Sequence, residues 1–346
     1  MIPVGDGPVV CVGETMVALV PEHSGVELAA ADSLRLAVAG AESNVAMYLA
    51  DHGVPVRWVS AVGDDPFGRR VVAEVAARGV DVSGVRTDPA RPTGLMVKSP
   101  GEHGTRVHYY RRGSAASTLG PAVLDDSAVR TAGLLHLTGI TAALSHSCRA
   151  LVDAALRGPV PVSFDVNHRP ALWSDGPVLP PAEGIRPHPS QRAEESAAAV
   201  LYDFADRADL VLVGLDEAQA LWDDALADAA AVRALLPRPR VLVVKDGARA
   251  ATVFDGTDVH TVPARAVDVV EPVGAGDAFA AGFLAGLLRG ESPVRALRLG
   301  HLTAGAALRV TGDHGPLPDP ALIERLLAAD DAVWASAEAD GDLPVH

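Results

Sequence analysis

A short segment late in the chain combines small residues with two carboxylates. It reads Glu271-Pro-Val-Gly-Ala-Gly-Asp277, and an almost wholly apolar stretch, residues 278–288, follows it. That stretch has helical composition, so the backbone N–H groups of Gly274, Ala275 and Gly276 would be free at a buried helix N-terminus, which stabilises an anion. Asp277 in the first turn places a carboxylate where a hydroxyl proton is removed. An anion site beside a base is the minimum equipment for phosphoryl transfer to an alcohol.

The same segment has plainer explanations. Gly-Ala-Gly could allow two helices to pack closely, and Asp277 could be an ordinary carboxylate in a first helical turn. Two common classes of nucleotide site are disfavoured, because GxGxxG spacing is absent and no Gly-Lys-Ser/Thr follows.

The elements that position this segment form an alternating series. Continuous apolar runs are typical of strands buried on both faces, and helical stretches separate them. The runs are residues 9–14, 57–62, 134–137, 160–165, 210–213 and 241–244, and crossover helices are predicted over 43–52 and 66–78. The pattern predicts an α/β fold with a largely parallel sheet. Residues 25–38 and 93–110 instead alternate apolar and polar side chains, which predicts strands of a separate small sheet.

Composition excludes several classes. The 346 residues are 49% hydrophobic and 21% charged, and the net charge of −15 disfavours binding to nucleic acid or to an anionic membrane. Cys11 and Cys148 lack CxxC spacing, which argues against structural zinc and indicates small core residues in a reducing compartment. His136, His146, His301 and His314 show no recognised metal spacing and are expected in the core or on the surface. No targeting or membrane-spanning segment is evident, so a cytoplasmic location is expected.

Two ordered motifs carry a family resemblance. The segment 271–277 with its apolar helix resembles the C-terminal signature of the ribokinase-like (PfkB) carbohydrate kinases. Residues 39–46, AGAESNVA, together with 62–68, VGDDPFG, resemble the N-terminal signature. The resemblance implies one ribokinase-like three-layer α/β/α domain over residues 1–346, with a small β-sheet lid inserted at about 14–38 and 91–113. It also implies a homo-oligomer through the lid. Residues 175–196 are rich in proline and are interpreted as a loop insertion.

Finer matches are similar to the 2-keto-3-deoxygluconate kinases: residues 109–115, 136–140, 165–169 and 312–314. The resemblance implies ATP with Mg²⁺ as cofactors, a monovalent cation as a further one, and a small sugar acid as substrate. The residues implied for catalysis are Asp277, Gly274, Ala275 and Gly276; for the substrate, Gly40, Ala41, Glu42, Ser43, Asn44, Tyr109, Tyr110, Arg111, Ile140, Arg169, Asp277 and Asp313; for ATP, Asn167, His168, Arg169, Lys245, Gly247, Ala248, Arg249 and 274–276.

Arginine chemistry supports an acidic substrate independently, because a guanidinium binds a carboxylate through a bidentate fork. Arg111 and Arg169 are the candidates, and surface ion pairs are their alternative. Asn167 could equally be a turn residue, Lys245-Asp246-Gly247 an ordinary hairpin, and Asp313 a loop carboxylate.

The sequence departs from the family pattern at three places. Glu271 stands where Asp is usual, and Gly214 where an Asn precedes the Glu that is here Glu217; both glutamates are expected to act on metal only indirectly. Residues 93–96 lack a tyrosine often found near the sugar acid. The alternatives are therefore a sibling kinase for a neutral sugar, of the fructokinase or ribokinase type, and a noncatalytic sensor of sugar acid or nucleotide.

Overall fold

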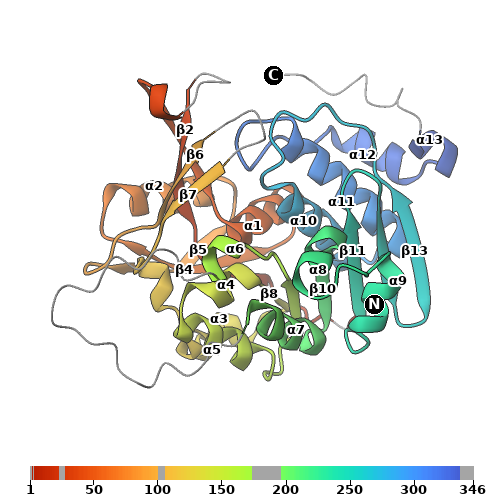
Figure 1. Ribbon diagram of the computed structural model, residues 1–346, viewed down its shortest axis with the longest axis horizontal. Helices are drawn as coiled ribbons and strands as arrows, with labels where there is room; N and C mark the ends of the chain where they lie inside the picture. Colours follow the sequence, from red (N-terminus) through yellow and green to blue (C-terminus); the bar gives the residue numbers. More distant parts are fainter. Residues whose placement is uncertain (1, 3, 23–27, 100–105, 174–195, 336–346) are drawn as a thin grey trace.

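The computed structural model describes residues 2, 4–22, 28–99, 106–173 and 196–335. A nine-stranded sheet forms the body of the molecule (Figure 1). Its strands, in spatial order, are β13 (Asp258–Pro263), β12 (Ala250–Asp255), β11 (Val241–Asp246), β10 (Leu210–Gly214), β9 (Val162–Asp165), β8 (Leu134–Thr138), β1 (Val9–Val12), β4 (Val56–Gly63) and β5 (Asp81–Asp88). The strands from β11 to β5 are parallel, and the β11–β12–β13 edge is antiparallel. The predicted α/β fold is confirmed.

Helices cover both faces of this sheet, which explains the continuous apolar runs. In β10, Leu210 and Leu212 face one core, and Val211 and Val213 face the other. The first core includes α1 (Ala41–Asp51), α2 (Pro66–Ala77), α10 (Ala275–Leu288), α11 (Pro293–Leu308), α12 (Pro320–Leu327) and α13 (Asp331–Ala335). The second includes η2 (Ala115–Thr118), η3 (Pro121–Asp125), α3 (Ser127–Arg130), α4 (Gly139–Leu144), α5 (His146–Ala155), α6 (Pro170–Trp173), α7 (Ala197–Arg207), α8 (Leu215–Leu221) and α9 (Ala229–Leu235).

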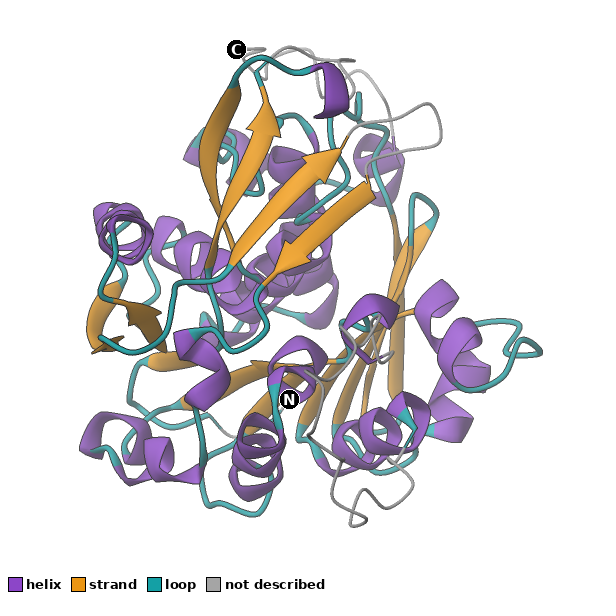
Figure 2. Ribbon diagram, turned by 60° about the vertical axis from the view of Figure 1, so that its left-hand side comes forward, coloured by secondary structure: helices purple, strands orange, loops and turns teal. Residues whose placement is uncertain are grey.

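A four-stranded sheet stands apart from the main one (Figure 2). Its order is β3 (Leu34–Ala39), β2 (Met16–Pro21), β6 (Leu95–Ser99) and β7 (Arg106–Tyr110). The separate small sheet is confirmed, but the strand expected from residue 25 begins only at Leu34, because Leu28–Ala30 form the 3-10 turn η1. The proposed loop insertion lies, apart from its last residue, outside the described residues.

Helices α10 and α11 pack very closely in the first core. A Cβ on Gly282 would lie 2.4 Å from Thr303 Oγ1 and 2.5 Å from the Leu299 carbonyl oxygen, so only glycine fits there. Both cysteines are buried, as expected. Within the described ranges, no helix is long and apolar enough to span a bilayer.

Candidate active site

The carboxyl ends of five adjacent parallel strands bring the predicted residues to one edge of the sheet. Glu14 follows β1, while Thr138, Asp165 and Lys245 lie at the ends of β8, β9 and β11. Ligands of open α/β sheets bind at this edge. The small sheet begins there as well, because β2 starts two residues after Glu14.

The anion site is formed where α10 begins. Gly274 is the N-cap, with φ 88°, and a Cβ on it would lie 2.9 Å from the Asp313 carbonyl oxygen. Gly276 is exposed, so the expected buried N-terminus is wrong: the helix body is buried while its first turn opens to solvent. A Cβ on Gly276 would lie 3.6 Å from Lys245 Nζ. The ammonium and the helix N-terminus therefore adjoin one another, and both favour an anion.

Asp277 is buried and held by two amides. Asn44 Nδ2 donates to its Oδ2 at 2.9 Å, and Asn167 Nδ2 donates to its Oδ1 at 3.0 Å. Burial raises the pKa of Asp277 from 3.8 to about 6; Asn44 and the charge of Arg169 oppose that rise, whereas Asp165 and Asp313 add to it. This value suits a base that works near neutral pH.

Asn167 lies in the turn that follows β9 and contacts Asp277. Its φ is 38°, a left-handed conformation that asparagine tolerates better than most residues. The turn after β9 thereby aims its amide at Asp277, so the turn and the site are one feature.

The start of α1 supplies the substrate side. Gly40 is required because a Cβ would lie 2.5 Å from the Glu14 carbonyl oxygen. Ala41 is buried, and Ser43 Oγ donates to the Gly40 carbonyl. Glu42 also turns inward, accepting from Thr138 and Thr141 at 2.7 and 2.6 Å. Burial raises the pKa of Glu42 to about 7, although these hydroxyls lower it.

Asp313 links Asn44 to the small sheet. Its Oδ2 accepts from Asn44 Nδ2 at 3.4 Å, and its Oδ1 pairs with Lys98 Nζ at 2.9 Å. Both side chains of the ion pair are buried. Asp313 therefore lies with Asn44 and Lys98 rather than standing as an isolated loop carboxylate.

Arg111 is paired inside the protein. Its Nε and Nη2 both lie 2.5 Å from Glu14 Oε2, and its guanidinium lies over the Tyr109 ring. This is neither a surface ion pair nor an open clamp. Tyr110 is 66% exposed and, by strand alternation, points away from Tyr109, so the structure does not place it with the other candidates. Ile140 is buried in the first turn of α4, beside Thr138.

The side expected to hold nucleotide contains a charge network. Lys245 Nζ pairs with Asp165 Oδ2 at 2.9 Å. Burial alone would lower the pKa of Lys245, but the charges of Asp165 and Glu217 raise it, so the side chain stays cationic. Arg169 is exposed. Among the described residues, no contact joins Arg169 and Arg111 in one carboxylate-binding site. Gly247, Ala248 and Arg249 form the exposed turn of the β11–β12 hairpin, and Arg249 bonds Asp246 at 2.7 Å.

Glu217 lies in the first turn of α8. It accepts from the backbone N–H groups of His168 and, at 3.1 Å, Gly214, so it caps the start of α8. Burial and Asp165 raise the pKa of Glu217. The buried Asp165 Oδ1 has no hydrogen-bond partner among the described residues. Carboxylate oxygens at this place fit Mg²⁺ held through water.

Among the described residues, no group of three or more His, Cys, Asp or Glu side chains is arranged to hold a metal ion directly. Glu271 Oε1 accepts from the Val273 N–H at 3.4 Å. His136 and His301 are core residues, His146 is exposed, and His314 stacks on Tyr48 and lies near Asp51.

Sequence reasoning missed Lys98, Glu14 and Asp165. Lys98 and Lys245 are the only lysines among the 29 lysine and arginine residues, and both are in this site. That scarcity is a signal the sequence does carry.

Comparison with known proteins now decides the family. The model of the pfkB family of carbohydrate kinases matches residues 7–320. The chain belongs to the pfkB family. A 2-dehydro-3-deoxygluconokinase from Thermoproteus tenax is 35% identical over 84% of this chain and 86% of its own, and one from Bacillus subtilis is 34% identical over 84% and 87%. The crystal structure of a PfkB protein from Polaromonas sp. JS666 has a TM-score of 0.75 at 32% identity, covering 93% of this chain and 99% of that one.

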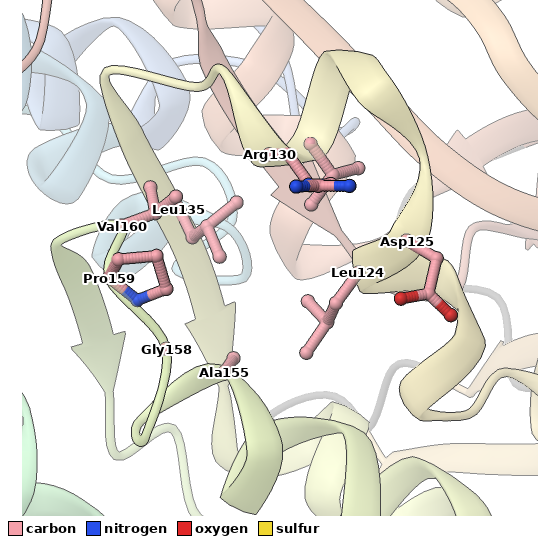
Figure 3. A pocket seen from close by; sticks show the side chains of 9 residues that line it. Leu124, Asp125, Arg130, Leu135, Ala155, Gly158, Pro159 and Val160 are labelled. Carbon is pink, nitrogen blue, oxygen red and sulfur yellow. The ribbon is translucent and has the colours of Figure 1, made fainter.

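A cavity of about 350 Å³ lies at the opposite ends of the strands, away from the site of this pfkB kinase (Figure 3). Leu135 at the start of β8, Val160 before β9 and the η3–α3 segment line it. Because it lies at the amino ends of the strands whose carboxyl ends form the site, it takes no part in the chemistry.

Proposed function

We propose that this chain is an ATP-dependent kinase that phosphorylates the terminal hydroxyl of 2-keto-3-deoxygluconate, giving 2-keto-3-deoxy-6-phosphogluconate and ADP. The observation that carries the proposal is Asp277: a buried carboxylate with its pKa raised to about 6, held by two amides at the glycine-rich start of α10. The names of the similar kinases support the sugar acid as substrate.

In the proposed reaction the terminal hydroxyl oxygen bonds to the γ-phosphorus, and the bond from that phosphorus to the β-phosphate oxygen breaks. The hydroxyl proton passes to Asp277, and ADP leaves with the electron pair. The N–H groups of 274–276, the helix dipole and Lys245 stabilise charge on the phosphoryl oxygens. Mg²⁺, when bound with ATP, offsets phosphate charge; Asp165 and Glu217 are the residues that would hold its waters.

The lid and phosphate contacts remain part of the proposal. Asn167, His168, Arg169 and the 245–249 turn would contact the nucleotide, while Asn44 and Asp313 would contact sugar hydroxyls. The small sheet would exclude water that otherwise hydrolyses ATP. Leu34 and Tyr110 are exposed on this sheet, which supports the expected homo-oligomer; sedimentation of a Tyr110→Lys variant tests it, and an unchanged oligomer would argue for another interface.

A neutral-sugar kinase is the second candidate, because Glu14 already neutralises Arg111. ADP release is measured with Mg²⁺, ATP and 2-keto-3-deoxygluconate, its galactonate epimer, gluconate, fructose or ribose. Preference for the 2-keto-3-deoxy acids supports the proposal, preference for a neutral sugar replaces its substrate, and no release with any of them favours a noncatalytic sensor.

The base is tested by Asp277→Asn. Turnover should fall by at least about 1,000-fold with the fold retained, since the amide keeps the shape but takes up no proton. Asp319→Asn, at the start of α12 and outside the site, is the matched control. A near wild-type kcat in Asp277→Asn would show that another group removes the proton.

A further inference from the structure

One buried side chain of α13 joins that helix to the end of β13 (Figure 1). Trp334 is 1% exposed, and its Nε1 donates to the carbonyl oxygen of Pro263, the last residue of β13, at 2.9 Å. The guanidinium carbons of Arg265 and Arg298 lie over its ring, 5.2 and 5.0 Å from the ring centre. Arg265 also donates to the Trp334 carbonyl oxygen, and Arg298 pairs with Asp331 at 2.8 Å. An indole that is buried, hydrogen-bonded and in contact with two cations fixes α13 in place.

The same contacts hold the start of the segment that leads into the anion site. This linking segment, residues 264–273, joins β13 to α10, and the structure describes all of it. It contains no helix or strand, and none of its residues is buried, so the core does not fix its course. At its far end the Leu308 carbonyl oxygen accepts from the N–H groups of Val270 and Glu271, at 2.8 and 3.3 Å. At its near end the contacts of Pro263 and Arg265 with Trp334 take that part.

The near end of the linking segment also touches the turn that is expected to contact the nucleotide. The Ala264 N–H donates to the Arg249 carbonyl oxygen at 2.9 Å, so this bond joins the linking segment to the 245–249 turn. Trp334 holds the residue on each side of Ala264. A shift of the indole would therefore move the start of the linking segment and the turn together.

A second route leads from Trp334 to the helix that begins at the anion site. The His301 ring lies 6.3 Å from the Trp334 ring, and it meets the Phe279 ring edge-on at 5.2 Å. His301 Nε2 also bonds the Val262 carbonyl oxygen at 3.2 Å, which ties α11 to β13. Phe279 stands two residues after Asp277 in α10. Trp334 is thus connected to both parts of the nucleotide side, the hairpin turn and the start of α10.

We infer that Trp334 is a positioning residue for ATP: through Pro263 and Arg265 it fixes the 245–249 turn relative to the anion site. The inference rests on the place that the proposed function gives the nucleotide. Trp334 touches no reacting atom; it keeps two separate stretches of backbone in the arrangement that one nucleotide must bridge. The proposed sugar contacts come from α1 and Asp313, so the effect should fall on the nucleotide and not on the sugar.

The test is the dissociation constant of Mg·ADP, measured by titration calorimetry with no sugar present. Trp334→Phe keeps a buried ring but loses the N–H donor to Pro263, so the dissociation constant should rise about 3- to 10-fold. Arg265→Met removes the cation over the ring and the bond to the Trp334 carbonyl, and it should give a similar rise. ADP release should show the same rise in the KM for ATP, with the KM for 2-keto-3-deoxygluconate within about twofold.

Trp222→Phe is the matched control. Trp222 Nε1 donates to the Ala198 carbonyl oxygen at 3.0 Å, and the residue lies at the end of α8 away from Glu217. It packs against the core on the other face of the main sheet from Trp334. Its loss of the same kind of hydrogen bond should leave the Mg·ADP dissociation constant and both KM values unchanged.

A double variant separates positioning from a general loss of stability. Trp334→Phe/Arg265→Met should bind Mg·ADP no more weakly than the weaker single variant, because both act through one contact. Arg265→Met retains the indole, so it decides the matter even if Trp334→Phe fails to fold. Losses that multiply in the double variant, an unchanged dissociation constant in the folded single variants, or equal rises in the two KM values would overturn the role of Trp334.

Failure of the proposed function gives a different result. A wild-type chain that binds Mg·ADP but phosphorylates no sugar acid would refute the proposed substrate, and the role of Trp334 would still be decided by the Mg·ADP titrations. A wild-type chain that binds no Mg·ADP would overturn both.

Discussion

The acid side of the pH profile offers a direct test of the base. Burial raises the pKa of Asp277 from 3.8 to about 6, a bias of about 3 kcal/mol toward the protonated form. Only the carboxylate accepts the hydroxyl proton, so kcat/KM for the sugar acid should fall tenfold per pH unit below about pH 6. Above pH 7 this group should no longer limit the rate.

Replacement of Arg169 by Met should move the acid limb of the pH profile. The Arg169 charge favours the ionised form of Asp277, so its loss raises the pKa of Asp277 and shifts the acid limb to higher pH. Arg169 is exposed, so solvent screens it and the shift should be at most about one unit. The profiles are measured as ADP release between pH 5 and 9 in a constant-ionic-strength buffer, which holds that screening fixed.

Glu42 is the group that could imitate this result. Its pKa is raised to about 7 and it is fully buried. Glu42→Gln should leave the acid limb in place if Asp277 is the base. A limb near pH 4, or one that disappears in Glu42→Gln and ignores Arg169→Met, would refute the reasoning.

Three further predictions concern the surroundings of the site. The folded-state pKa of Glu42 is about 7, above its unfolded value of 4.5. Raising the pH from 5.5 to 8 should therefore lower the free energy of unfolding by about 2 kcal/mol. Glu42→Gln should abolish that part of the change in Tm. Lys245→Met removes the cation beside α10 and should lower kcat about 100-fold and raise the KM for ATP, both read from ADP release; unchanged values would exclude phosphate contact. Gly282→Ala should destabilise the protein by about 1–3 kcal/mol, because the added Cβ would overpack α11. In Gly305→Ala the nearest neighbour of the new Cβ would be Val267 Cγ2 at 3.6 Å, so this variant should be stabilised by about 0.5–1 kcal/mol. Urea unfolding midpoints compare the two variants, and equal effects would contradict the packing argument.

Local pattern was enough to predict the body of the fold. The runs at 9–14 and 210–213 are apolar without interruption because helices cover both faces of β1 and β10, and such burial leaves a direct mark on the sequence. The helix after Gly274 was equally visible, since eleven of its residues are buried. The small sheet was visible through alternation, although η1 shows that alternation alone does not fix where a strand begins.

Partner choice inside the site was not predictable from local pattern. Arg111 and Glu14 are 97 positions apart, and Lys98 and Asp313 are 215 apart. Arg111 and Arg169 were both assigned to a ligand because guanidinium suits carboxylates, but for Arg111 the internal carboxylate of Glu14 satisfies the same chemistry. The packing of the small sheet against the loop of Asp313 brings Lys98 to its carboxylate partner, and local sequence pattern does not show that packing.

Pairing within the site has a consequence for how a sugar acid binds. Asn44, Asp277, Asp313 and Lys98 hydrogen-bond one another, so their burial is compensated within the protein. Sugar hydroxyls would exchange with these bonds, whereas a carboxylate adds a new negative charge beside several acidic groups. That addition is favourable only if a cation has donors left over after pairing.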